Sequence, residues 1–112
     1  MTDVQDADRY KEACAVFGDE GAQARVRMLR SDLSKQLTRI AQGRFDHAAL
    51  REMAHRTAGR AGTLGFADLA DASARLDDAA RHNDGVAAAL EHWTQQARRA
   101  AEPPTPAMDG SS

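Results

Sequence analysis

Hydrophobic residues recur every three or four positions along most of the chain, which is the periodicity of amphipathic α-helices. The second such stretch shows this most clearly, with apolar side chains at Val26, Leu29, Leu33, Leu37 and Ile40. No segment alternates apolar and polar residues with a period of two, so β-strands are not expected. The pattern therefore predicts an all-α fold.

Five helical segments follow from this periodicity. Their apolar positions span residues 10–17, 26–40, 50–64, 66–80 and 86–100. Glycine or asparagine, which are weak helix formers, interrupt them near residues 18–21, 42–43, 62–65 and 83–85. Asp46 is a good N-cap for the third segment, and Phe45 is spaced to pack on Leu50 as a hydrophobic staple.

Four long helices joined by short loops pack most economically as an antiparallel up-down four-helix bundle, to which the short first segment adds an extra N-terminal helix. We expect residues 1–101 to form this bundle as one domain. Residues 102–112 contain all three prolines of the chain and end in Asp-Gly-Ser-Ser. This composition predicts a disordered C-terminal tail.

Composition narrows the class of protein. The formal net charge is −2 at pH 7, which gives no electrostatic footprint for nucleic acid. The first residues lack the basic and apolar parts of a secretory signal, and no stretch approaches the ~20 apolar residues of a membrane span. The single cysteine, Cys14, cannot form an internal disulfide and fits a reducing compartment. We expect a monomeric cytoplasmic protein that binds neither nucleic acid nor a membrane.

One histidine of the third segment lies off its apolar stripe. That stripe consists of Leu50, Met53, Thr57, Ala61 and Leu64. At roughly 100° of rotation per residue, His55 points about 160° away from it. Its neighbours on the exposed face are small apart from one arginine: Arg51, Ala58, Gly59 and Gly62. An imidazole held out on such a face suits a chemical event carried out on it by another macromolecule.

The residues around His55 match a known family pattern, in which an alanine and histidine are followed by two glycines and, one helix later, by a leucine and an acid or amide. The matching positions are Ala54, His55, Gly59, Gly65, Leu76 and Asp77. Over roughly residues 10–100 the chain resembles the histidine-containing phosphotransfer (HPt) domain of two-component phosphorelays. The order and lengths of the expected helices agree with that resemblance.

The resemblance implies a carrier whose His55 is phosphorylated. It would accept a phosphoryl group from an aspartate of a response-regulator receiver domain and pass it to another receiver. A hybrid histidine kinase is a further expected partner. The carrier would need no cofactor of its own, because the receiver brings the Mg²⁺ ion. It would not be a kinase, and the chain carries no glycine-rich phosphate loop for ATP.

One position departs from the family. A lysine usually stands three residues after the histidine and offsets the phosphoryl charge, whereas this chain has Ala58. Four arginines are candidates to replace that lysine: Arg51, Arg56, Arg60 and Arg81. Either one of them has taken over its role, or the chain is a slow or degenerate carrier.

The resemblance also suggests how His55 is prepared and reached. Asp77, on the facing helix, can accept a hydrogen bond from the inner ring nitrogen and so fix the tautomer. A glycine inside a helix costs about 1 kcal/mol relative to alanine, and no core packing demands one at Gly59 or Gly62. Together with Ala58, these two glycines are expected to form the face on which a receiver docks.

Two alternative hypotheses about the function stay open. A bundle that binds a receiver or a kinase without being phosphorylated would act as an adaptor or inhibitor, and the missing lysine favours it. An unrelated bundle that merely oligomerises should expose an apolar stripe, which the His55 face lacks. No metal site is expected, because the spacing of His47, His82 and His92 matches no common ligand motif.

Overall fold

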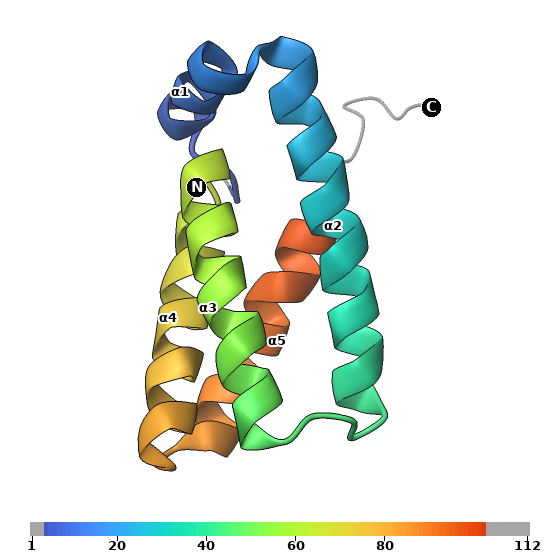
Figure 1. Ribbon diagram of the computed structural model, residues 1–112, viewed down its shortest axis with the longest axis vertical. Helices are drawn as coiled ribbons and strands as arrows, with labels where there is room; N and C mark the ends of the chain where they lie inside the picture. The colour runs from blue at the N-terminus through green and yellow to red at the C-terminus, as the bar shows by residue number, and fades with distance from the viewer. Residues whose placement is uncertain (1–3, 103–112) are drawn as a thin grey trace, which may run out of the picture.

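The computed structural model describes residues 4–102, and α-helix is the only regular secondary structure in this part of the chain. The helices are α1 (Ala7–Phe17), α2 (Asp19–Ala41), α3 (His47–Leu64), α4 (Ala67–His82) and α5 (Val86–Ala101) (Figure 1). The prediction of an all-helical chain with five helical segments is confirmed for these residues. Of the expected tail at residues 102–112, only Glu102 is described, as the C-cap of α5, and the rest lies outside the described residues.

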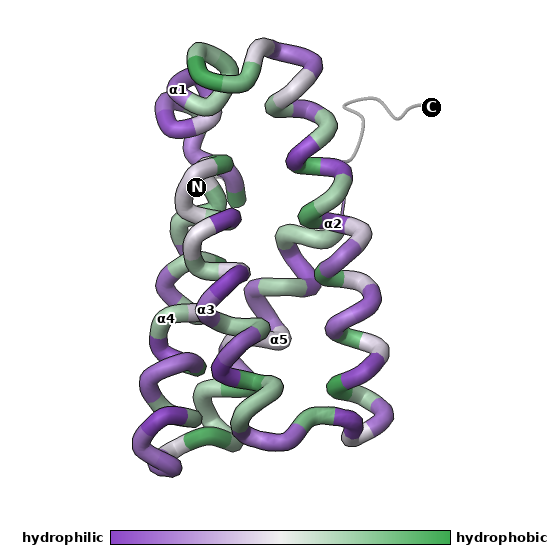
Figure 2. Tube along the Cα trace, viewed as in Figure 1, coloured by the Kyte–Doolittle hydropathy of each residue, from purple (hydrophilic) through white to green (hydrophobic). Residues whose placement is uncertain are grey.

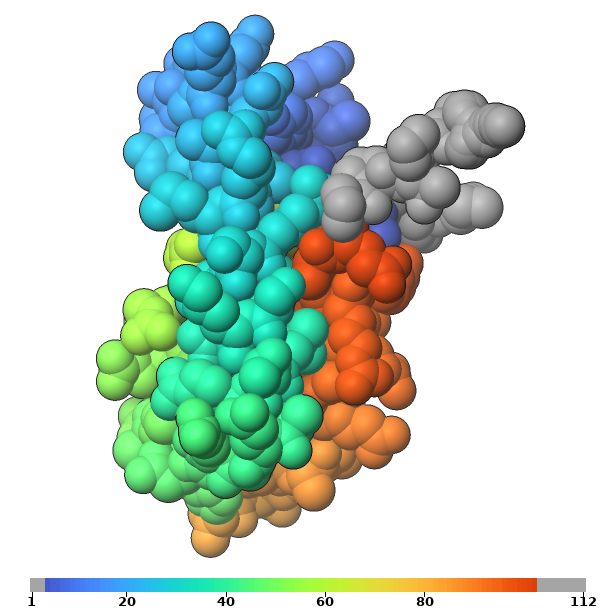
Figure 3. Space-filling view, turned by 90° about the vertical axis from the view of Figure 1, so that its right-hand side faces the viewer, coloured from blue at the N-terminus to red at the C-terminus, as the bar shows by residue number. Residues whose placement is uncertain are grey.

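The four long helices run lengthwise through the molecule, and α1 lies across one end (Figure 1). The closest packing is between α3 and α4, followed by α4 with α5 and α2 with α5. In the side view, α2 runs beside α5 and then continues past it to meet α1 (Figure 3). Of the helix pairs that are in contact, α2 and α3 touch least, although only a short loop joins them.

The core is made of the apolar stripes read from the sequence. Figure 2 shows hydrophobic and hydrophilic positions alternating along each helix, as amphipathic helices require. The predicted stripe of α3 is buried along its whole length, with Leu50, Met53, Thr57, Ala61 and Leu64 each at most 3% exposed. Trp93 of α5 is fully buried, and its indole Nε1 donates a 2.8 Å hydrogen bond to Ser73 Oγ on α4.

Small side chains allow α3 and α4 to approach closely. Ala54 and Ala61 of α3 and Ala72 of α4 are fully buried. A Cβ placed on Gly62 would lie 3.9 Å from Ala70 Cβ, so α3 and α4 are separated there by little more than one methyl group. This close packing brings the exposed edges of both helices within reach of each other.

The helix ends agree with the sequence at some places and not at others. Asp46 caps α3 as predicted, because its side chain accepts a 2.8 Å hydrogen bond from the Ala49 amide. The interruption expected at residues 62–65 is confirmed at its last residue, since α3 continues through Gly62 to Leu64 and ends at Gly65 in the left-handed conformation. A Cβ at Gly65 would also lie 2.6 Å from the Asp6 carbonyl oxygen, so the N-terminal segment crosses directly over this residue.

The break expected at residues 18–21 is much shorter in the structure. Gly18 alone separates α1 from α2, which begins at Asp19. Gly21 lies inside α2, where a Cβ would approach Phe17 Cβ to 3.2 Å. Gly21 therefore allows the close approach of α1 and does not end a helix.

Within the described residues, no helix is both long and apolar enough to cross a membrane.

Candidate functional site

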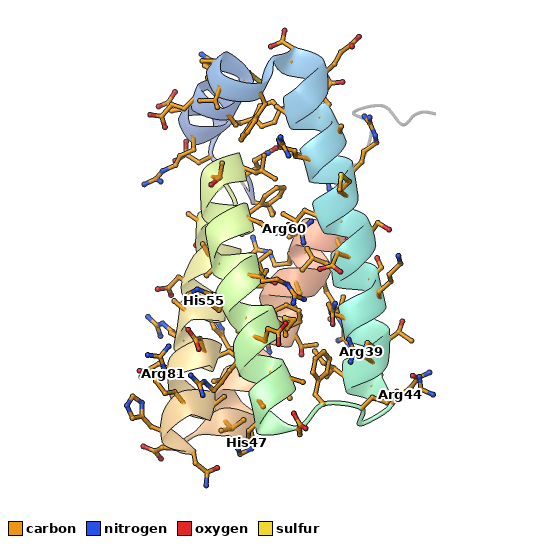
Figure 4. The ribbon with its side chains drawn as sticks, viewed as in Figure 1. Arg39, Arg44, His47, His55, Arg60 and Arg81 are labelled. Atoms are coloured by element: carbon orange, nitrogen blue, oxygen red, sulfur yellow. The ribbon has the colours of Figure 1, made fainter. Side chains whose placement is uncertain are left out.

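His55 lies in the middle of α3, on the side opposite its buried stripe. The side chain is 80% exposed. Figure 4 shows it on the edge of α3 that faces α4. The buried neighbours Met53 and Ala54 hold the backbone at this point against the core, so the imidazole projects from a fixed support.

The ring contacts a single carboxylate on the next helix. His55 Nδ1 lies 3.5 Å from Asp77 Oδ2, and the Asp77 side chain is only 15% exposed. Leu76, the residue before Asp77, is fully buried in the core and fixes the rotation of α4 at this point. Because Nδ1 faces the carboxylate, Nε2 is the ring nitrogen on the edge away from α4.

Two arginines share that carboxylate with His55. Arg81 Nη2 lies 3.3 Å from Asp77 Oδ2, one turn further along α4. Arg51 Nε approaches Asp77 Oδ1 to 4.0 Å from α3. Both guanidinium groups are about half exposed. Three nitrogen-bearing side chains from two helices thus surround one half-buried acid, and we call Arg51, His55, Asp77 and Arg81 the His55 cluster.

The other two candidate arginines lie elsewhere and are already paired. Arg56 Nη1 is 3.1 Å from Glu52 Oε1 within α3. Arg60 Nη1 is 3.3 Å from Asp32 Oδ2 of α2, across the most loosely packed pair of helices. The structure therefore brings together His55, Asp77, Arg51 and Arg81, and it leaves Arg56 and Arg60 outside this cluster.

A groove of about 740 Å³ begins at His55 and runs between α3 and the start of α2. Arg56, Gly59 and Arg60 line it from α3. Phe17, Arg25 and Met28 line the other wall, with the Arg25 guanidinium 4.0 Å above the Phe17 ring.

Phe17, Arg25 and Met28 are not among the site residues that the sequence predicts. One signal was available: Met28 falls off the apolar stripe of its helix between Val26 and Leu29, and the structure leaves it 62% exposed.

The expected docking face is only partly open. Gly59 is exposed, and a Cβ there would meet nothing within 4 Å, so the fold of this chain does not require glycine at that position. Ala58 is half-buried. Gly62 departs from the expectation of an open face, because it is half-buried and turned toward Ala70 of α4.

The remaining histidines are dispersed over three helices. His82 Nδ1 lies 3.2 Å from Asp78 Oδ1 on the exposed side of α4, whereas His47 begins α3 and His92 belongs to α5. Among residues 4–102, no group of three or more His, Cys, Asp and Glu side chains is arranged to hold a metal ion.

Comparison with protein families yields one match. A family model described as "Hpt domain" matches residues 20–104. The matched span contains the whole His55 cluster and begins after α1. Neither the curated proteins nor the solved structures provide a match to this chain.

Proposed function

The chain belongs to the Hpt domain family, and we propose that His55 is the residue on which it carries the phosphoryl group. Hpt domains are phosphocarriers rather than kinases, and they act in two-component signalling with receiver domains and histidine kinases. The observation that carries the assignment is that His55, 80% exposed, has its Nδ1 against a carboxylate while Nε2 remains on the outer edge of the ring.

In the proposed reaction, the neutral His55 ring donates a hydrogen bond from Nδ1–H to the Asp77 carboxylate. The lone pair on Nε2 attacks the phosphorus of a receiver's aspartyl phosphate, so that an N–P bond forms as the acyl O–P bond breaks. The receiver's aspartate leaves as a carboxylate, and the imidazole ring gains one positive charge. Asp77 keeps the reactive tautomer and stabilises that charge.

Arg51 and Arg81 supply the positive charge that the family usually draws from a lysine at the position of Ala58. Phosphoryl transfer passes through a loose transition state, and catalysis is chiefly positioning and charge neutralisation. One terminal nitrogen of Arg81 donates a hydrogen bond to Asp77, and Arg51 Nε lies 4.0 Å from the same carboxylate, so each guanidinium keeps further N–H donors for the phosphoryl oxygens. Arg56 and Arg60 are the more remote candidates, since they are paired with Glu52 and Asp32 and lie outside the His55 cluster.

We propose that Ala58 and Gly59, together with the groove beside His55, form the docking face, with half-buried Gly62 at its edge toward α4. Exposed Gly59 gives a receiver loop room to approach the ring. We further propose that α2–α5 form an antiparallel up-down four-helix bundle to which α1 is added. The carrier is a monomer in the cytoplasm, requires no cofactor of its own, and relies on the receiver for Mg²⁺. Its partners are a receiver domain and a hybrid histidine kinase, and it binds neither nucleic acid nor a membrane.

A labelled-phosphate transfer experiment tests the assignment. A receiver charged with labelled acetyl phosphate is mixed with the wild-type protein, with His55→Gln and with His82→Gln. His82 is a matched control, because it is also exposed and also lies beside an aspartate. We expect acid-labile, alkali-stable label on the wild type and on His82→Gln and none on His55→Gln. Label that survives in His55→Gln would reject His55 as the carrier residue.

The main support of the adaptor hypothesis is the missing lysine at Ala58, and this alternative is not favoured. Two guanidinium groups already lie beside His55, so the missing lysine does not leave the imidazole without cations. An adaptor would bind the receiver equally well with and without His55 and would never acquire label.

A further inference from the structure

We propose that the groove wall formed by α1 and the start of α2 selects the partner, and that it fits an amphipathic helix with acidic side chains beside its apolar face. Arg25 is the residue of this wall that recognises the acidic side chains. The inference rests on the proposed function, because the groove begins at His55. It names the chemistry of the partner surface, which membership of the family does not determine.

The charge of the groove is opposite to that of the whole chain. The chain has a formal net charge of −2, yet the lining of the groove contains three arginines and, among residues 4–102, no carboxylate. These arginines are Arg25, Arg56 and Arg60. A cleft lined by charges of one sign attracts groups of the opposite sign. The groove therefore favours an acidic partner.

Arg25 differs from the other two arginines in what it contacts. Arg56 and Arg60 each lie beside a carboxylate that is not part of the groove lining. In the described part of the chain, the exposed Arg25 guanidinium is stacked on the Phe17 ring instead, at 4.0 Å from the ring centroid. Stacking holds a guanidinium in place and leaves its N–H donors available to a carboxylate. Arg25 is thus a fixed positive charge whose carboxylate partner can come from another molecule.

Apolar side chains lie beside Arg25 on the same wall. Among the described residues, the exposed large hydrophobic side chains are Val16 and Met28, at 75% and 62%. Met28 lines the groove, and Val16 lines a smaller adjoining pocket that shares Phe17 and Thr63 with it. The apolar surface therefore continues from the groove onto α1. Because α1 precedes the span that the family model matches, its share of this wall is a feature of the present chain.

An amphipathic α-helix is the partner element that satisfies both features. Its apolar residues recur every three or four positions and fill a groove as one stripe, with charged residues along the edges of the stripe. A partner strand would need a free sheet edge, and residues 4–102 offer none because their regular structure is helical. A flat membrane surface does not enter a groove to reach half-buried Phe17.

Two synthetic peptides test this selection. Each is a helix of about 15 residues with the same leucine stripe, and the edges of the stripe carry glutamates in one peptide and lysines in the other. Amide NMR shifts of the nitrogen-labelled protein follow their binding. Arg25→Glu is the test variant. Arg27→Glu is the matched control, because Arg27 is an exposed arginine of the same helix that lines a different pocket.

We expect the wild type to bind the glutamate peptide about tenfold more tightly than the lysine peptide, with shifts at Gly59 and Thr63 of the groove. In Arg25→Glu this ratio should fall at least about fivefold, whereas Arg27→Glu should stay within about twofold of the wild type. Met28→Ser should weaken both peptides without changing the ratio, because it removes only apolar contact. Added salt should reduce the ratio in the wild type.

Equal affinities for the two peptides, absence of binding, or a ratio that Arg25→Glu leaves unchanged would overturn the inference. Vesicles of phosphatidylglycerol are the further probe. Binding of the protein to these vesicles that depends on Arg25, without binding of either peptide, would identify a membrane as the occupant and would also overturn it.

The peptides contain no phosphoryl group, so the two proposals fail in distinguishable ways. If a charged receiver labels His55 but the peptides bind without selection, only the present inference is wrong. If the glutamate peptide is selected through Arg25 but no charged receiver labels His55, the proposed function is wrong. Circular dichroism of each variant shows whether the bundle is intact.

Discussion

Arg81 and His55 approach the same oxygen atom, Asp77 Oδ2, at 3.3 and 3.5 Å from two different helices. This shared contact is possible because small residues such as Ala54 and Ala72 let α3 and α4 pack closely. It places a guanidinium group next to the imidazole although the position of the usual family lysine holds Ala58.

Removal of either clustered arginine should slow phosphorylation of His55. A charge-assisted hydrogen bond contributes about 1.5–3 kcal/mol, so Arg51→Ala and Arg81→Ala should each reduce the transfer rate from a charged receiver by about 10- to 100-fold. Arg75→Ala is the control, because Arg75 is an exposed arginine of α4 that pairs with Asp71 at 2.9 Å. Rates equal to the wild type in both cluster variants would show that neither arginine offsets the phosphoryl charge.

A lysine at position 58 should compensate for a lost arginine. Ala58 lies on α3 at the position where the family usually has its cation, and it is half-buried with an adjacent exposed face at Gly59. We expect Ala58→Lys to recover at least about tenfold of the transfer rate lost in Arg51→Ala, since it returns one charge-assisted contact. The single variant Ala58→Lys measured in the wild-type background is the control. Absence of recovery would mean that the two cations are not interchangeable.

The Gly59→Ala variant should distinguish an effect on the stability of the fold from an effect on docking of the receiver. A Cβ at this position meets nothing within 4 Å, so the substitution should stabilise α3 by up to about 1 kcal/mol in denaturant unfolding. The same methyl group stands beside His55 on the face assigned to the receiver, and it should therefore slow transfer from a receiver but not chemical phosphorylation. If both reactions keep their wild-type rates, the receiver does not approach this glycine closely.

Gly65→Ala should have the opposite effect on stability. Gly65 has a φ of 92°, and a Cβ there would lie 2.6 Å from the Asp6 carbonyl oxygen. The variant should lose more than about 1 kcal/mol of unfolding free energy, because both the backbone conformation and the crossing of the N-terminal segment oppose a side chain. A wild-type midpoint in a thermal or denaturant titration would contradict the observed end of α3.

The elements were predictable because helical periodicity depends on local order along the chain. The buried stripe of α3, the N-cap at Asp46 and the exposed position of His55 all follow from spacing and residue type. The break at residues 18–21 was overestimated, since glycine signals both helix ends and close helix contacts. Gly21 belongs to the second kind, as its 3.2 Å approach to Phe17 Cβ indicates.

The pairing of side chains between helices was harder to predict from the sequence. Arg60 was a candidate for the phosphoryl group, yet its partner is Asp32 on α2. That pairing depends on the rotation and spacing of two helices, which the periodicity of either one does not determine. The groove has the same origin, because it exists where α2 diverges from α3 and leaves Met28 exposed.

The most direct test of the central claim is to locate the phosphoryl group after incubation with a charged receiver. Phosphorus and nitrogen NMR of the wild-type protein should show one N-phosphorylated imidazole, assigned to Nε2 of His55 by its loss in His55→Gln. A phosphoryl group on Nδ1 of His55, or on His47, His82 or His92, would contradict the account.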